Sequence, residues 1–203
     1  MGVDSTTQTA QSEEKHNPVP NGPRVLVAYA SKYGSTKGIA EFIGEKLGKR
    51  GMGADVRDVS TVMVLGEYDA FVIGSAVFMG HWMKEAKQFV SQNRSFLSTR
   101  PVWIFSSGPT GTSETDKKGR NLRKVSGPTE IGELRESLNP RDHHVFFGAF
   151  HPDQMKGAMG FFGRMAPKED QGDFRNWTEI EAWTNSIADS LSVEPKASQV
   201  SRI

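Results

Sequence analysis

Continuous apolar runs alternate along the chain with segments in which apolar residues recur every three or four positions. Four short runs are almost wholly apolar, which is typical of strands that are covered on both faces of a parallel sheet. They lie at residues 25–29, 71–73, 102–105 and 145–147, and the last is predicted to be the final central strand. A weaker and more polar run at residues 54–59 is suited to an edge position. The pattern therefore predicts five strands.

Helical periodicity fills the intervals between these runs and continues to residue 191. Gly51 and Asn139-Pro140 are predicted to end two of the helices, and Thr178 with Glu181 to form a capping box in the last. Strands that alternate with helices indicate a doubly wound α/β fold, with helices on both faces of the sheet. The apolar positions with helical spacing are Ile39, Phe42, Ile43, Leu47; Met83, Ala86, Phe89, Val90; Ile131, Leu134, Leu138; and Trp177, Ile180, Trp183, Ile187, Leu191.

Composition places these elements in one domain and excludes several kinds of chemistry. The 203 residues include no Cys, so disulfides, thiolate metal sites, iron–sulfur clusters and cysteine nucleophiles are excluded. A formal net charge of +1 gives no reason to expect a nucleic-acid partner. Residues 1–23 are predicted to form a disordered tail and residues 193–203 a flexible one, which leaves a domain at 24–192. The chain shows neither a membrane span nor a secretory signal, so we expect a cytoplasmic protein.

The loop after the first strand combines three hydroxyl side chains with a glycine and leads directly into a helix. Ligands of such a sheet bind beyond the carboxyl ends of its strands, and a helix N-terminus there favours phosphate. An ordinary N-cap needs only one Ser or Thr. Neither G-x-G-x-x-G nor G-x-x-x-x-G-K-[ST] follows the strand, which disfavours dinucleotides and nucleoside triphosphates. The residues predicted to bind phosphate are Ser31, Lys32, Tyr33, Gly34, Ser35 and Thr36.

Two further loops are predicted to hold a flat ring. The second loop carries aromatic and sulfur side chains, although Met79 and Trp82 can equally pack against the next helix, and His81 can contact a ligand or cap that helix. The third is polar and rich in glycine. An isoalloxazine ring needs apolar side chains around it and backbone groups along its polar edge. The residues assigned to it are Ser75, Ala76, Val77, Phe78, Met79 and Gly80, with Ser107, Gly108, Pro109, Thr110 and Gly111.

The first loop resembles the phosphate loop of flavodoxins, [ST]-x-x-G-x-T, and the likeness extends over about residues 24–191. It implies a flavodoxin-like sheet with the strand order 2-1-3-4-5 and FMN as the cofactor. Among flavodoxin-like proteins the chain most resembles the menaquinone-dependent protoporphyrinogen dehydrogenase group, in which FMN carries reducing equivalents from a porphyrinogen to a quinone. The third loop departs from that group's pattern. The resemblance therefore implies FMN more firmly than it implies a porphyrinogen as the substrate. The residues that carry this likeness are Tyr68, Asp69, Val72, Ile73, Gly74, Gly80, His81, Phe89, Val90, Phe147, Gly148, Ala149 and Trp177.

Three functions compete for such a protein. The first is an FMN-dependent oxidoreductase that acts on a small molecule or a quinone. The second is an electron carrier that docks to redox proteins, but carrier flavodoxins are strongly acidic and this chain is nearly neutral. The third is a relative that has lost its cofactor, which the intact first loop disfavours. No side chain is assigned as a catalytic acid or base.

Two other segments are candidates for a substrate site. Residues 151–165 hold Met and Phe side chains among glycines and cations, and can cover the flavin, make peripheral contact with a membrane or pack under the sheet. A basic cluster on the preceding long connection can bind carboxylates or simply face solvent. Its members are Lys117, Lys118, Arg120, Arg123 and Lys124.

Overall fold

Five parallel strands form the centre of the molecule, in the order β2-β1-β3-β5-β6. The computed structural model describes residues 22–154, 164–165 and 167–193, so most of both predicted tails lies outside it. The order confirms the predicted 2-1-3-4-5 arrangement, with the polar strand β2 at one edge. The strands are β1 (Arg24–Ala30), β2 (Gly53–Asp58), β3 (Ala70–Phe78), β5 (Val102–Ser107) and β6 (Asp142–Phe146).

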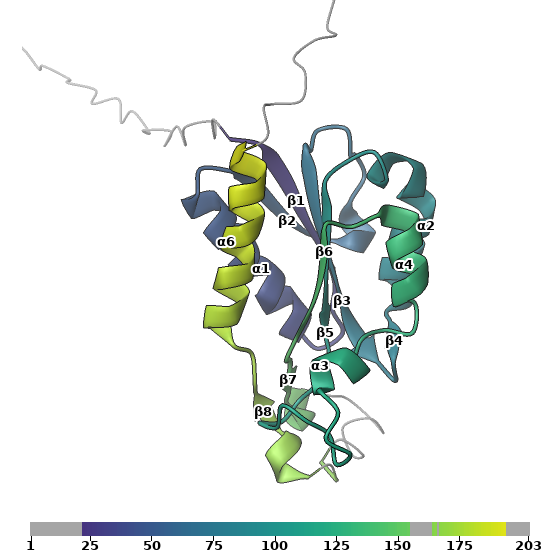
Figure 1. The fold of residues 1–203 in the computed structure, drawn as a ribbon, viewed down its shortest axis with the longest axis vertical. Coiled ribbons are helices and arrows are strands. Elements are labelled where there is room, and N and C mark those ends of the chain that lie inside the picture. The colour runs from purple at the N-terminus through teal and green to yellow at the C-terminus, as the bar shows by residue number, and fades with distance from the viewer. Residues whose placement is uncertain (1–21, 155–163, 166, 194–203) are drawn as a thin grey trace, which may run out of the picture.

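Helices cover both faces of this sheet (Figure 1). α1 (Ser35–Lys49) and α6 (Trp177–Val193) lie on one face, and α2 (Lys84–Leu97) and α4 (Ile131–Leu138) lie on the other. None of the helices in the described part of the chain is long and apolar enough to cross a membrane.

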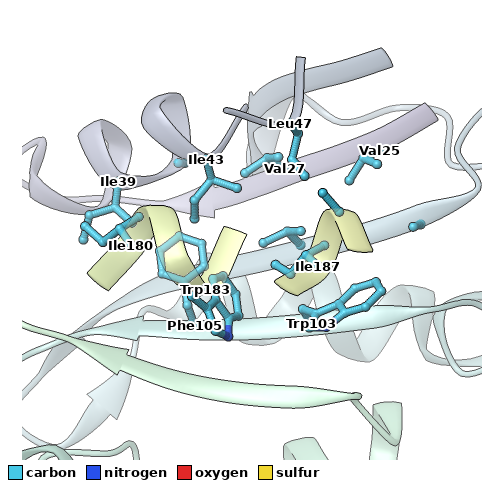
Figure 2. Close-up of a cluster of buried hydrophobic side chains, with 14 of the residues drawn as sticks. Val25, Val27, Ile39, Ile43, Leu47, Trp103, Phe105, Ile180, Trp183 and Ile187 are labelled. Atoms are coloured by element: carbon cyan, nitrogen blue, oxygen red, sulfur yellow. The ribbon is translucent and has the colours of Figure 1, made fainter. Parts of the chain in front are cut away.

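Each face of the sheet packs its own hydrophobic cluster. Val25 and Val27 of β1 face α1 and α6, whereas Leu26 and Ala28 face α2 and α4. Successive side chains of a strand point to opposite faces, so a strand buried on both must be apolar throughout. Figure 2 shows the first cluster, in which Trp183 of α6 lies against the sheet. Burying each large apolar side chain contributes roughly 1.5–3 kcal/mol.

The predicted helix ends are confirmed at two positions. Gly51 has φ +82° just after α1, and Asn139 has φ +46° at the end of α4. The left-handed conformation lets the last carbonyls of a helix find backbone partners, and Gly and Asn adopt it at least cost.

The predicted capping box of α6 is wrong. Asn176, not Thr178, caps the helix, because its Oδ1 accepts a hydrogen bond from the amide of Glu179 at 3.1 Å. Glu181 instead forms an ion pair with Lys46 of α1, with Nζ and Oε1 2.7 Å apart. The helix begins at Trp177, so Thr178 is already inside the first turn.

The prediction for the last strand is also corrected. β6 spans Asp142–Phe146, so it begins three residues before the predicted run and does not include Phe147, while its outer position is the one that the predicted strand order gives to the fifth strand. Its first three residues are polar and only partly covered, which an outer position permits, whereas Val145 and Phe146 are buried.

Several short elements were not predicted and gather at the carboxyl ends of the strands (Figure 1). β4 (His81–Trp82) turns back along β3 as a hairpin, with Met79 and Gly80 at the turn. Both turn residues have positive φ, +52° and +80°, which a two-residue hairpin loop requires. The other short elements are β7 (Ala149–Phe150), β8 (Gly172–Asp173), α3 (Leu122–Val125), η1 (Val59–Thr61), η2 (Pro152–Gln154) and η3 (Lys168–Asp170).

Candidate functional site

A cavity of about 680 Å³ opens at the carboxyl ends of the strands, where the order of the sheet reverses between β1 and β3. All three predicted loops contribute to it, together with a fourth segment that follows β6. The lining residues are Ser31, Lys32, Tyr33, Ser35 and Thr36; Ala76, Val77, Phe78, His81, Trp82, Met83, Lys84 and Glu85; Ser107, Gly108 and Thr110; and Gly148, Ala149 and Phe150.

The first loop is built around Gly34. Its φ is +86°, a conformation that favours glycine, and its amide donates to Ser31 Oγ at 3.1 Å. No side chain in the described residues caps α1, so the first amides of this helix are not satisfied by a cap. A helix N-terminus of this kind suits an anion, because its amides and dipole both favour negative charge.

Thr36 supplies the sharpest indication of what the first loop binds. Its side chain is buried, yet Oγ1 has no hydrogen-bond partner among the described residues. An unsatisfied buried hydroxyl costs about 1–3 kcal/mol, so native proteins seldom keep one without a ligand or a functional reason. A phosphate oxygen at the N-terminus of α1 would satisfy it.

Ser35 joins the first loop to the fourth segment. Its Oγ accepts a hydrogen bond from the amide of Ala149 at 2.8 Å and lies 3.5 Å from Ser107 Oγ. A Cβ at Gly148 would come within 3.1 Å of Ser107 Oγ and 3.3 Å of Ser35 Oγ. Glycine at position 148 therefore permits the close approach of three segments at this end of the cavity.

The second loop is a hairpin rather than an open loop. Ala76, Val77 and Phe78 line the cavity, whereas Met79 and Gly80 form the turn outside it. Met79 neither lines the cavity nor packs under α2, since 84% of its surface is exposed. Ser75 is buried and structural, with its Oγ accepting from the amide of Met83 at 3.0 Å.

Trp82 serves both of the roles considered for it. Its ring is buried against the sheet and also forms part of the cavity wall. The indole Nε1 donates to Ser106 Oγ at 2.8 Å, which fixes the orientation of the ring.

The third loop contributes three of its five predicted residues to the cavity wall. Ser107, Gly108 and Thr110 line it, while Pro109 and Gly111 do not. The carbonyl of Pro109 accepts from the amide of Gly148 at 2.9 Å. This loop therefore also holds the fourth segment in place.

His81 stands at the cavity wall and does not cap α2. Its Nδ1 lies 2.9 Å from Glu130 Oε1 and 2.8 Å from Thr129 Oγ1. Lys87 Nζ lies 2.8 Å from the same carboxylate oxygen. Burial alone would raise the pKa of Glu130, but hydrogen bonds from Lys87 and His81 outweigh it and lower the pKa to about 2. Glu130 is thus an anchor that links the hairpin to α2 and α4.

The basic cluster on the long connection does not line this cavity. Arg123 is paired with Glu179, Nη2 to Oε2 at 2.8 Å, and stacks over Phe147 with 4.6 Å to the ring centroid. Arg120 is paired with Asp116. Within residues 151–165, Met165 is largely exposed and Arg164 pairs with Asp153, while residues 155–163 lie outside the described part of the chain.

The fourth segment, residues 148–150, was not assigned to the site from the sequence, although Gly148 and Ala149 are among the residues that carry the family resemblance. Gly148 follows a predicted strand, but one glycine there is indistinguishable from an ordinary turn. Only its closeness to Ser35 and Ser107 in space gives it a role.

Comparison with known proteins agrees with this geometry. A family model described as the flavodoxin domain matches residues 26–169, which is more than half of the chain. The chain belongs to the flavodoxin family. As for other members, FMN is the cofactor of this flavodoxin domain. When bound, FMN supplies flavin N5 for hydride or electron transfer.

The relatives of this flavodoxin domain include both enzymes and flavodoxins. It is 27% identical over 85 residues to protoporphyrinogen IX dehydrogenase (quinone) of Escherichia coli K12, a stretch that covers 41% of this chain and 47% of that protein. The match thus spans about half of the relative's length. Oxidised flavodoxin 2 of Bacillus cereus is 18% identical, with 82% and 99% of the two chains covered and a TM-score of 0.53. Rubredoxin:oxygen oxidoreductase of Desulfovibrio gigas is 12% identical, with 86% and 37% covered and a TM-score of 0.54. These structures share the fold.

Proposed function

We propose that this protein is an FMN-dependent oxidoreductase whose substrate is a small molecule or a quinone. The observation that carries the proposal is the character of the cavity. Its walls include Phe78 and Phe150, and the carboxylate and ammonium side chains along it are Glu85, Lys32 and Lys84. A cavity of this size suits FMN with a small molecule beside it, whereas carrier flavodoxins dock through an acidic surface and this chain has a net charge of +1.

Lys32 supports an electron-rich or anionic ligand in this cavity. Its Nζ lies 4.8 Å from the centroid of the Phe78 ring and 5.5 Å from that of Tyr33. Cation–π contacts of this kind hold the ammonium group beside the cavity wall. A quinone carbonyl or a substrate carboxylate entering along Phe78 would meet this charge.

We further propose how the predicted site residues divide between ligand and scaffold. Residues 31–36 hold the FMN phosphate; Ala76, Val77, Phe78, Ser107, Gly108 and Thr110 contact the rest of the cofactor. Ser75, Met79, Gly80, Pro109 and Gly111 shape the loops that carry these contacts. The E. coli relative, by its name a quinone-dependent protoporphyrinogen IX dehydrogenase, makes a quinone the first acceptor to test and a porphyrinogen the first donor.

Reoxidation of the reduced, FMN-loaded protein tests this proposal. We expect rapid reoxidation by a soluble menaquinone analogue and slow exchange with a ferredoxin reductase. Rapid exchange with the reductase alone would instead identify an electron carrier. The double substitution Ser35→Ala and Thr36→Ala should weaken FMN binding, and unchanged affinity would reject the assignment of residues 31–36.

A further inference from the structure

A second cavity, of about 380 Å³, lies beside β6 at the outer edge of the sheet. Its volume is within the range of roughly 300–1,000 Å³ that is typical of small-molecule sites. Among the described residues, none lines both this cavity and the cavity of about 680 Å³ that is assigned to FMN (the FMN cavity). Its lining residues come from α3, α4, β6 and the turn between the two helices: Arg123, Lys124, Gly127, Ile131, Arg135, His143, His144 and Val145.

The charged groups of the second cavity are all basic. None of the described residues that line it has a carboxylate, and Ile131 and Val145 supply apolar side chains. Arg123 and His144 are both held by Glu179. Lys124 and Arg135 are exposed, and neither is paired with a carboxylate within the described residues. Two cations at one cavity without paired carboxylates form a field that attracts anions.

A protective role for these cations is the competing explanation. Within the part of the chain that the structure describes, β6 pairs only with β5, so its other edge presents backbone groups that can pair with another strand. Proteins often place Lys or Arg near such an edge to prevent this. That role needs exposed charge but no cavity, and it predicts no affinity for a small anion.

His143 connects the second cavity with the FMN cavity. Its Nε2 lies 2.9 Å from Ser106 Oγ, which accepts a hydrogen bond from Trp82 Nε1. An indole N–H can only donate, so the Ser106 hydroxyl is free to donate its proton to a neutral His143. Burial, reinforced by the charge of Arg135, lowers the pKa of His143 to about 4. Trp82 lines one cavity and His143 the other, so two hydrogen bonds join them.

We propose that the second cavity binds a small anion with a phosphate or carboxylate group between Lys124 and Arg135, and that Trp82, Ser106 and His143 transmit its binding to the FMN cavity. Protonation of His143 is opposed first by its burial and then by the charges of Arg135 and His144, and it is favoured by Asp142. A bound anion offsets the charge of Arg135 and so favours a proton on Nε2. His143 then donates a hydrogen bond to Ser106 Oγ, and the Ser106 hydroxyl must donate its own proton to another acceptor. The hydrogen bond that orients the Trp82 indole changes as a result.

Calorimetric titration of the FMN-loaded protein tests the binding step, with inorganic phosphate and succinate as separate probes. We expect one of them to bind, and the double substitution Lys124→Gln and Arg135→Gln to weaken that binding about tenfold, since charge-assisted hydrogen bonds are lost. The matched control is Lys117→Gln with Arg94→Gln, which removes the same charge away from both cavities and should leave affinity within about twofold. No binding of either probe, or equal losses in both variants, would overturn the site. Neither result depends on which substrate the flavin oxidises.

The dissociation constant of FMN with and without the anion tests the transmission step. We expect a change of about fivefold or more, within the usual range of coupling between sites. Ser106→Ala should abolish this change, because it removes the middle of the hydrogen-bonded chain. His143→Gln retains an acceptor for Ser106 but cannot take up the proton, and should abolish it too. Transmission along this route would be rejected if the parent protein binds FMN equally well with and without the anion. It would also be rejected if the anion still changes FMN affinity in both variants.

Discussion

Thr36 shows how one side chain can reveal a ligand. Its hydroxyl is buried and unpaired in the described structure, so in the free protein it opposes folding. Thr36→Val keeps the shape and removes the hydroxyl. We expect the FMN-free variant to be about 1 kcal/mol more stable to urea, and its FMN affinity to fall about tenfold, because a hydrogen bond to a charged group is lost.

Thr184 provides the matched control for Thr36. It is also a buried threonine in a helix, but its Oγ1 donates to the carbonyl of Ile180 at 2.7 Å. Thr184→Val should lower the stability by about 1 kcal/mol and leave FMN binding unchanged. If the two substitutions shift stability in the same direction, the special role of Thr36 is wrong.

Among the secondary-structure elements, α6 gives a direct comparison between the cap expected from sequence and the cap observed. Asn176→Ala should destabilise the protein by about 1 kcal/mol, since the amide of Glu179 loses its partner. Thr178→Ala, on the exposed first turn, should cost less than about 0.5 kcal/mol. Urea unfolding of the two variants measures the difference in the free energy of unfolding. A larger loss of stability in Thr178→Ala would show that Thr178 caps the helix.

Glu130 ties the β3–β4 hairpin to α2 and α4, and its contribution depends on pH. Its pKa is about 2 in the folded chain against an ordinary value of 4.5, so the unfolded state takes up a proton first on acidification. The stability that Glu130 adds is therefore present above about pH 4.5 and is lost as the pH falls toward 2. The expected loss is about 1–2 kcal/mol, allowing for solvent screening.

Glu130→Gln isolates this contribution. The variant should be less stable than the parent near neutral pH and should converge with it in acid. Glu133→Gln, an exposed carboxylate in the first turn of α4, is the control and should follow the parent curve. Urea unfolding across the acid range supplies the curves, and a constant offset between parent and Glu130→Gln would show that Glu130 does not titrate as described.

Element by element, the sequence could predict what local patterning determines. The buried strands form apolar runs in the sequence because both of their faces are covered. Gly51 and Asn139 indicate helix ends because both residue types readily adopt the left-handed backbone found there. The hairpin could not be predicted, since Met at the first turn position is atypical where Asn, Asp or Gly is preferred. Trp82 remained ambiguous because its burial and its place in the cavity wall both arise from long-range packing.

At the scale of the whole molecule, FMN should stabilise the fold through the site at the carboxyl edge. Ligand at about 100 times its dissociation constant adds about 2.7 kcal/mol, which corresponds to a rise in Tm of roughly 5–10 °C for a chain of this size. Riboflavin lacks the phosphate and should give a clearly smaller rise at the same concentration. Thermal unfolding with each ligand measures both, and equal shifts would mean that residues 31–36 do not hold phosphate.

The candidate site as a whole was predictable only in part. The phosphate loop is continuous in sequence, so its hydroxyls and glycine can be seen together. Residues 148–150 join it through Ser35 and Ser107 after an interval of more than one hundred residues, and no local pattern records that contact. Arg123 likewise does not line the FMN cavity and pairs with Glu179 at the start of α6, a contact that no local pattern in the sequence reveals.

The contacts of Ser35 also set the order in which the site can be completed during synthesis. The phosphate loop is synthesised before two of its partners. Ser35 Oγ accepts a hydrogen bond from the amide of Ala149, and the Ser35 carbonyl lies 3.4 Å from Arg175 Nη1. The absence of a Cβ at Gly38 leaves room for this Arg175 side chain. Both partners belong to the last third of the chain. FMN therefore meets its finished site only after residue 175 has been made, and cofactor loading reports that synthesis has reached the start of α6.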